Sequence, residues 1–552
     1  MRSHTIAFRI ALPVLLLATG TVIAHSEHGT LYVAASGVDA GNCRDVHKPC
    51  QTLLYALARA GKGEQLRVAA GTYEIARAEG TMLVGDLIDV RGGYATRDAF
   101  ASADASANPT FVVGPSPALR ERMAERGMTL VQDQKGMGLE KEAGDVVDID
   151  ESAPTAATCQ DGKAGPFACR GLDLLRWMKL NEFSTRPTSA NDIWGFKDLN
   201  TGREYALIGL RNALAVVDVT LPKRPREIGS IPGPSSTWRD MDVIQFFDDE
   251  AGRWKAYAYC VADATNQGLQ IIDLTGLPDS VSLATTYTAF SSAHTIHMSN
   301  VNRTTGVALP GLKPYLYIEG SNLNRGAFRT LDISNPVAPV EVIAPGANQQ
   351  YAHDAASFVL TGARAAQCEA GHDPCEVYVD YNENTVDLWD TTDKTRPFRL
   401  SSTPYPGSGY THSGWPTEDN MFVFVQDELD ETNFGTNTLL RTMDISDLRQ
   451  PFISNIWTGP TQAIDHNGYV KGSRFYFANY RRGTTILDIA DPNNPQEIAF
   501  FDSYPGSDSS FFNGPWGVYP FLPSGTIVVS DIDRGLFILR EQQPAEDVAD
   551  AR

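Results

Sequence analysis

Four histidines recur at nearly regular spacing in the second half of the chain, and imidazole is the protein side chain that most often binds transition metals. They are His294, His353, His412 and His466, separated by 59, 59 and 54 residues. The same step continues with other polar residues at Asn191, Arg239 and Asn513, which gives seven starts spaced 47 to 59 residues apart. We predict a metal site that uses the four histidines, with zinc, copper or iron as the ion.

Carboxylates lie beside several of these positions or in loops that would open on the same face. They are Asp192, Asp240, Asp354, Asp427 and Glu428. A carboxylate can bind a metal directly or orient an imidazole ring. We therefore predict a binding face made of these five acids together with Asn191, Arg239 and Asn513. His297 should point away from His294, because an offset of three residues in a strand reverses the side-chain direction.

One alternative to metal binding by the histidines stays open at the sequence level: they only form hydrogen bonds between neighbouring repeats. The acidic run 426–431 can also be read as a calcium site, but this run lacks the glycine and the alternating ligands of a calcium loop. We interpret that run as a solvated acidic loop.

A second repeat indicates the elements that position these residues. Six short apolar segments each end in aspartate, and a proline follows within a few residues of each; the aspartates are Asp218, Asp273, Asp332, Asp390, Asp444 and Asp488. Proline cannot continue a central strand, so each marks a turn toward the outer strand of a sheet. A period near 50 residues with several short strands is typical of one propeller blade.

We therefore predict an all-β protein with a seven-bladed β-propeller of four-stranded blades over residues 170–540. The last blade has no outer strand after Leu539. Residues 172–180, just before the first blade, can supply that strand and close the ring, which removes exposed sheet edges. Because the inner strand of every blade lines the central channel, the seven starts should converge on one face.

The repeat ending in aspartate resembles the LVIVD repeat, and the order of motifs over residues 171–540 resembles the choice-of-anchor B family. The motifs that carry this resemblance include Asn191-Asp-Ile-Trp-Gly, Tyr351-Ala-His-Asp and Tyr410-Thr-His-Ser-Gly-Trp. The resemblance implies an exported or surface-displayed propeller whose biochemical activity is not established. The family's usual anchoring tail has no counterpart here, because residues 541–552 form a short polar tail.

Residues 25–135 read as a small β-rich domain, and residues 136–169 as a linker. Over residues 30–75 the pattern resembles the opening of right-handed β-helix proteins of the pectate-lyase-like kind. Only one such unit is visible, and a solenoid needs about three repeats to bury a core. We therefore expect a partial β-helix.

Residues 1–24 resemble an export signal, with two arginines, a short apolar run and a small-residue cleavage site. We predict a periplasmic or extracellular protein with no transmembrane segment in the mature chain. Six of the seven cysteines form close pairs, which predicts three disulfides: Cys43–Cys50, Cys159–Cys169 and Cys368–Cys375. Cys260 lies in an apolar run and is predicted to be a buried free thiol.

The net charge of −21 argues against binding to nucleic acid. We expect a monomer that binds a small molecule, a glycan or a partner protein at the channel face. The alternative is a metal-dependent oxidoreductase or hydrolase that uses the channel histidines. Finding a firmly held metal with an open coordination position would favour the enzyme.

Overall fold

The computed structural model describes residues 29–60, 64–75, 88–113, 120–131, 153–263, 265–343, 350–510 and 512–542. The predicted signal peptide lies outside the described residues, as do residues 136–152 of the predicted linker and residues 543–552 of the predicted tail.

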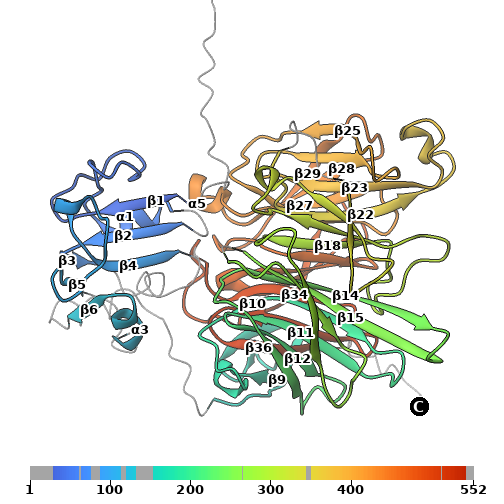
Figure 1. Cartoon of the computed structure of the whole chain (residues 1–552), viewed down its shortest axis with the longest axis horizontal. Helices are drawn as coiled ribbons and strands as arrows, with labels where there is room; N and C mark the ends of the chain where they lie inside the picture. The colour runs from blue at the N-terminus through green and yellow to red at the C-terminus, as the bar shows by residue number, and fades with distance from the viewer. Residues whose placement is uncertain are drawn as a thin grey trace, which may run out of the picture.

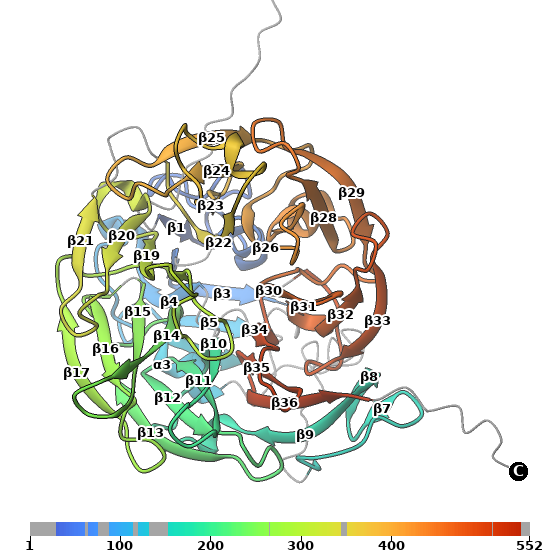
Figure 2. The same cartoon turned by 90° about the vertical axis from the view of Figure 1, so that its right-hand side faces the viewer.

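The larger part of the chain forms seven antiparallel sheets around a central axis (Figure 2), which confirms the predicted seven-bladed propeller. Blades one to three consist of β10 (Ala190–Lys197), β11 (Glu204–Leu210), β12 (Ala213–Asp218) and β13 (Arg226–Pro232); β14 (Arg239–Asp248), β15 (Arg253–Ala262), β16 (Leu269–Asp273) and β17 (Ser282–Tyr287); and β18 (Thr295–Ser299), β19 (Tyr315–Glu319), β20 (Arg329–Asp332) and β21 (Val340–Ile343). The first strand of each blade is innermost.

The remaining blades repeat this order. Blades four to seven consist of β22 (Asp354–Leu360), β23 (Cys375–Tyr381), β24 (Val386–Asp390) and β25 (Phe398–Thr403); β26 (Thr411–Pro416), β27 (Phe422–Asp427), β28 (Leu439–Asp444) and β29 (Phe452–Thr458); β30 (Gly468–Lys471), β31 (Arg474–Asn479), β32 (Gly483–Asp488) and β33 (Gln496–Phe501); and β34 (Pro515–Tyr519), β35 (Thr526–Asp531) and β36 (Gly535–Glu541), completed by β9 (Leu172–Met178).

The aspartate that ends the third strand stops that strand in six blades. Its carboxylate accepts a hydrogen bond from the backbone N–H two residues later, as Asp218 does from Thr220 at 3.0 Å and Asp390 from Thr392 at 3.0 Å. The same bond occurs at Asp273, Asp332, Asp444 and Asp488. Such aspartate turns compete with strand hydrogen bonding. The repeat in the sequence is therefore a set of turns that fixes the length of each third strand.

The ring is closed by β9, which pairs antiparallel with β36 and so joins Leu539 to Leu174. This is the closure predicted for residues 172–180. Part of the predicted linker differs from the expectation, because β7 (Lys163–Ala164) and β8 (Phe167–Arg170) extend blade six beyond β33. Phe167 is buried against Trp177, Phe501 and Phe537, and this apolar contact holds the segment on the propeller.

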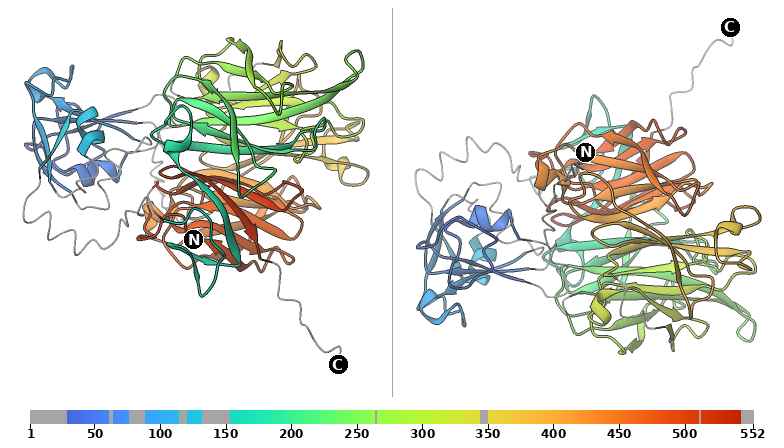
Figure 3. Two further views of the ribbon diagram at one scale, coloured as in Figure 1. Left: turned by 90° about the horizontal axis from the view of Figure 1, so that it is seen from below. Right: turned by 90° about the horizontal axis from the view of Figure 1, so that it is seen from above.

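The N-terminal unit contains two parallel sheets. One has the order β1 (Thr30–Val33), β2 (Gln65–Ala69) and β4 (Asp89–Tyr94), and the other has β3 (Gly71–Glu74), β5 (Thr110–Val113) and β6 (Met128–Val131). Two short helices, α1 (Leu53–Leu57) and α3 (Arg120–Glu125), accompany them. Figure 1 and Figure 3 show this unit in blue as a body of its own. Parallel pairing between successive strands is the pairing of a β-helix.

The three predicted disulfides are all present, and Cys260 is a buried free thiol. Among the described residues, no helix is both long enough and apolar enough to span a bilayer.

Candidate metal centre and channel

Six aromatic side chains from consecutive blades form an arc at the end of the channel where the innermost strands begin. We call this end the mouth. The arc runs through Trp238, His294, His353, His412, His466 and Trp516, with ring centroids 5.9, 4.4, 4.3, 4.3 and 5.1 Å apart. Together with Asp192 and Asp240 they line a cavity of about 270 Å³. The four predicted histidines are therefore neighbours at one opening.

The structure places tryptophans where sequence spacing predicted Arg239 and Asn513. Arg239 follows Trp238 and also lines the mouth cavity, but its guanidinium donates to Leu210 O at 3.0 Å and to Gln267 Oε1 at 2.5 Å. Asn513 accepts a hydrogen bond from Arg481 Nη2 at 2.8 Å and, within the described chain, lines neither channel cavity. The turns that precede the inner strands differ in conformation, so equal spacing does not give equal depth in the channel.

Glu428 lies between two of the histidines. Its Oε2 is 3.6 Å from His412 Nε2 and its Oε1 is 3.4 Å from His466 Nε2, and all three side chains are buried. Tyr480 donates its hydroxyl to Glu428 Oε1 at 2.9 Å. His412, Glu428 and His466 each offer one potential ligand atom within 4.8 Å of the other two, and they are the only such group of three with a histidine among the described residues. The arc thus concentrates metal-binding atoms at its His412–His466 end.

Hydrogen bonds fix which ring nitrogen of two histidines carries the proton. His353 Nδ1 donates to His412 O at 3.0 Å, and His466 Nδ1 donates to Trp516 O. A carbonyl oxygen only accepts, so Nδ1 must be the protonated nitrogen. A neutral His466 then presents the lone pair of Nε2 to the carboxylate of Glu428. Two facing acceptors require a cation between them, either a metal ion or a proton.

These bonds join neighbouring blades, as in the alternative interpretation of the histidines. His353 Nδ1 links blade four to blade five, and His466 Nδ1 links blade six to blade seven. Both bonds use the Nδ1 atom of the ring. His294 differs, because its Nδ1 lies 3.0 Å from Asp263 Oδ2. The four histidines therefore form an arc and do not converge on one point as a single ligand set.

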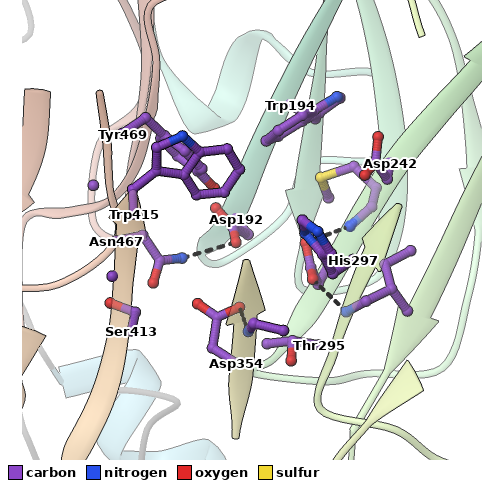
Figure 4. A pocket seen from close by; sticks show the side chains of 16 residues that line it. Asp192, Trp194, Asp242, Thr295, His297, Asp354, Ser413, Trp415, Asn467 and Tyr469 are labelled. Carbon is purple, nitrogen blue, oxygen red and sulfur yellow. Dashed lines mark hydrogen bonds between the residues drawn. The ribbon is translucent and has the colours of Figure 1, made fainter. Parts of the chain in front are cut away.

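A second cavity, which we call the channel cavity, lies further along the inner strands (Figure 4). Asp192 and Asp240 line both cavities and so join them. The aromatic side chains of Trp194, Trp415 and Tyr469 form its walls, with Tyr469 between the two tryptophans at centroid distances of 5.6 and 4.8 Å. Asn467, from blade six, donates to Asp192 Oδ2 at 2.9 Å.

Three acids of this cavity have raised pKa values. Burial, together with the nearby charge of Asp192, raises the pKa of Asp354 to about 7 and raises that of Asp240 well above its usual range. Burial raises the pKa of Asp242 to about 6, against the opposing positive charge of Arg303. His297, predicted to point away from His294, lines this cavity, and burial lowers its pKa. Asp242 and Asp354, with pKa values of about 6 and about 7, change charge near neutral pH.

The loop between β18 and β19, residues 300–314, closes the end of the channel opposite the mouth. Thr304 bonds to blades one and seven, since its O accepts from Lys197 N at 2.8 Å and its hydroxyl donates to Phe521 O at 3.0 Å. Gly306 O accepts from Gln245 N of blade two at 3.0 Å. The guanidinium of Arg303 stacks 5.0 Å above the ring of Trp415. The loop therefore joins blades one, two and seven at the end of the channel opposite the mouth.

Two further predicted positions have structural roles. Asp427 accepts hydrogen bonds from Tyr410 N at 2.7 Å and from Tyr405 Oη at 2.9 Å, so it holds the turn into β26. Asn191 donates to Thr237 O of the next blade. The interpretation of residues 426–431 as a solvated loop is wrong, because all the acids of this run are buried in the structure. The segment folds inward as α5 (Asp430–Phe434).

No family model matches this chain, and no curated protein matches it. Solved structures match at low identity. One is described as COPII on membranes, outer coat vertex (TM-score 0.44, 10% identity, 66% of this chain and 86% of that chain). Another is Chaetomium thermophilum Raptor (0.42, 10%, 64% and 28%), and a third is a putative 6-phosphogluconolactonase from Bacteroides fragilis (0.38, 11%, 63% and 89%).

Proposed function

We propose that the protein is an exported binding module that holds a transition metal at the mouth of its channel and takes up a small ligand in the cavity beneath. The observation that carries the proposal is the position of Glu428 between Nε2 of His412 and Nε2 of His466. Two imidazoles and one carboxylate leave coordination positions open, as in catalytic zinc sites and non-haem iron sites. An open position directed at the cavity would allow a ligand to reach the ion.

The distances support a metal rather than simple packing. Ligand atoms about 2.1 Å from a tetrahedral zinc ion lie about 3.4 Å from one another. The observed separations of 3.4 and 3.6 Å between Glu428 oxygens and the two Nε2 atoms match this value. A direct N–H···O hydrogen bond would be shorter, at about 2.7–3.2 Å.

The lining of the channel cavity indicates the kind of ligand. Asp192, Asp240 and Asp354 are carboxyl groups that a bound cation would favour in their charged form, and the face of Trp194 attracts cations. Small pockets of this type combine aromatic walls with a few polar groups that orient the ligand. We infer a small polar ligand that carries positive charge.

Export and family membership belong to the same proposal. Three disulfides support an oxidising compartment, since such bonds are rare in the cytosol. The six aspartate turns support placing the chain with LVIVD-repeat proteins of the choice-of-anchor B kind.

Metal titration of chelator-stripped protein tests the site. We expect one equivalent of zinc or copper to bind the wild type, and Glu428→Gln to weaken binding at least about tenfold, because the amide removes the anionic ligand. Glu319→Gln is the matched control. Glu319 is also fully buried and accepts a tyrosine hydroxyl, that of Tyr378 at 2.9 Å. Equal affinity in both variants and wild type would refute the site.

A metal-dependent oxidoreductase or hydrolase is the second candidate, and the raised pKa of Asp354 favours it. A carboxyl group with a pKa of about 7 can act as general acid or base at neutral pH. If the protein is such an enzyme, Asp354→Asn should abolish turnover of any substrate found while metal affinity stays unchanged. Unchanged turnover in this variant would exclude Asp354 from the chemistry.

A further inference from the structure

A group of three acids lies beside the mouth but outside the cavity described above. Asp430 and Glu431 stand in the first turn of α5, which follows β27 in blade five. Asp465 comes from blade six, in the segment before β30. Their exposed fractions are 0, 1 and 0%, and their carboxylate oxygens lie within 4.8 Å of one another. Two separate blades thus bring three carboxylates into one buried space.

The carboxylate of Asp465 gives an independent indication of a ligand. Neither of its oxygens accepts a hydrogen bond from another described residue. Asp430 and Glu431 lie close enough to share a hydrogen bond between their carboxyl groups. An unpaired buried carboxylate is strongly destabilising. Such an arrangement persists when a cation occupies it.

The protein supplies one cation to this group. Arg441 Nη2 donates to Asp430 Oδ2 at 2.6 Å, and the same nitrogen donates to Gly407 O at 3.1 Å. One guanidinium balances one of the three carboxylates.

We propose that Asp430, Glu431 and Asp465 bind a calcium ion. Calcium binds six to eight oxygens at about 2.3–2.6 Å, so oxygens on opposite sides of the ion lie about 4.8 Å apart. One oxygen from each carboxylate lies within 4.8 Å of the other two, so a single ion can contact all three. The group offers oxygens alone, which suits a hard cation and disfavours zinc or copper. Magnesium keeps several waters in a strict octahedron, and this buried group favours the larger ion.

This site goes beyond the proposed function and has a consequence for it. Glu428 precedes Asp430 by two residues, and His466 directly follows Asp465. A calcium ion would join α5 to the segment before β30. It would hold the two parts of the chain that carry Glu428 and His466 at a fixed separation. Calcium would therefore position Glu428 and His466 without contacting a small molecule bound in the channel cavity.

The test uses the full-length protein after treatment with a calcium chelator. Calorimetric titration with calcium chloride should show about one bound ion, and terbium should compete for the same site. Glu431→Gln and Asp465→Asn should each weaken calcium binding more than about tenfold, since each removes an anionic ligand. Asp380→Asn is the matched control, because Asp380 in blade four is buried and its Oδ1 also lacks a donor. That variant should bind calcium like the wild type.

Two measurements keep the proposal decisive if a variant folds poorly. In the wild type, calcium should raise the thermal midpoint relative to chelator, which needs no substitution. Glu431→Gln should still bind zinc or copper at the mouth, so failure of one site is distinguishable from failure of the other. If the acids share protons instead, calcium will leave the midpoint unchanged and the amide variants will be no less stable. That result, or calcium binding retained in both amide variants, would overturn the proposal.

Discussion

At the scale of single residues, the centre of the propeller gathers several buried acids. Asp240, Asp242 and Asp354 lie along the channel, and Glu428 lies at the mouth. Backbone N–H groups partly compensate, as Ile296 N does for Asp240 at 2.7 Å. Burial raises the pKa of the three channel acids because it penalises their charged forms. The channel should therefore respond to pH and to cations.

Asp242 gives a prediction for stability against pH. Its pKa is about 6 in the folded protein and about 4 in an unfolded chain. The folded state holds the proton of Asp242 more tightly than the unfolded chain does. The stabilisation that this proton gives is therefore complete below about pH 4 and is lost as pH rises through about 6. The loss is on the order of 2–3 kcal/mol. Asp242→Asn should flatten the pH dependence of the free energy of unfolding in this window, as measured by denaturant titration.

The control is Asp249→Asn in an exposed turn, which should keep the wild-type profile. Other channel acids titrate in the same window, so the variant should reduce the slope without removing it. An identical slope in the wild type and in Asp242→Asn would show that Asp242 is not buried in its acid form.

The sequence was sufficient to predict the four histidines at one opening, because each lies at or just before the start of the inner strand of its blade. It was not sufficient to predict the partners of those histidines. Glu428 was expected on the channel face, but its position between His412 and His466 depends on how α5 folds inward. Trp238 and Trp516 were missed at the ends of the arc, although both lie within three residues of a predicted start. Their aromatic character was the available signal.

At the scale of elements, the propeller combines regular blades with two local additions. The aspartate turns and the closing strand β9 followed from the sequence, since both depend on local residue types and on a missing strand. The loop 300–314 was not predicted, because its role depends on bonds to strands of blades one, two and seven. Its length between two strands was the only sequence signal. This loop joins these blades at the end of the channel opposite the mouth.

Truncation tests the closing strand. Deletion of residues 1–152 should leave a cooperatively melting propeller, because the remaining chain keeps β7, β8 and β9. Deletion of residues 1–182 removes the outer strand of blade seven and exposes β36, so cooperative melting should be lost. Differential scanning calorimetry distinguishes the two. Equal transitions would show that β9 is not needed to close the ring.

At the scale of the whole molecule, three disulfides and one buried thiol account for all seven cysteines. Cys260 is inaccessible in blade two, and burial raises its pKa. We expect no thiol to react with a thiol reagent in the native, unreduced protein and one to react after denaturation. Reaction of more than one thiol in denaturant would show that a predicted disulfide is absent.

Elemental analysis of protein purified without chelator tests the proposed metal centre most directly. We predict close to one equivalent of zinc, copper or iron in the wild type. We also predict that His412→Ala combined with His466→Ala lowers this occupancy sharply, while the protein still melts cooperatively. Imidazole ligands must be neutral, so occupancy should fall below about pH 6.5. A wild-type protein without transition metal, even after reconstitution, would contradict the metal centre and leave the histidines as bonds between blades.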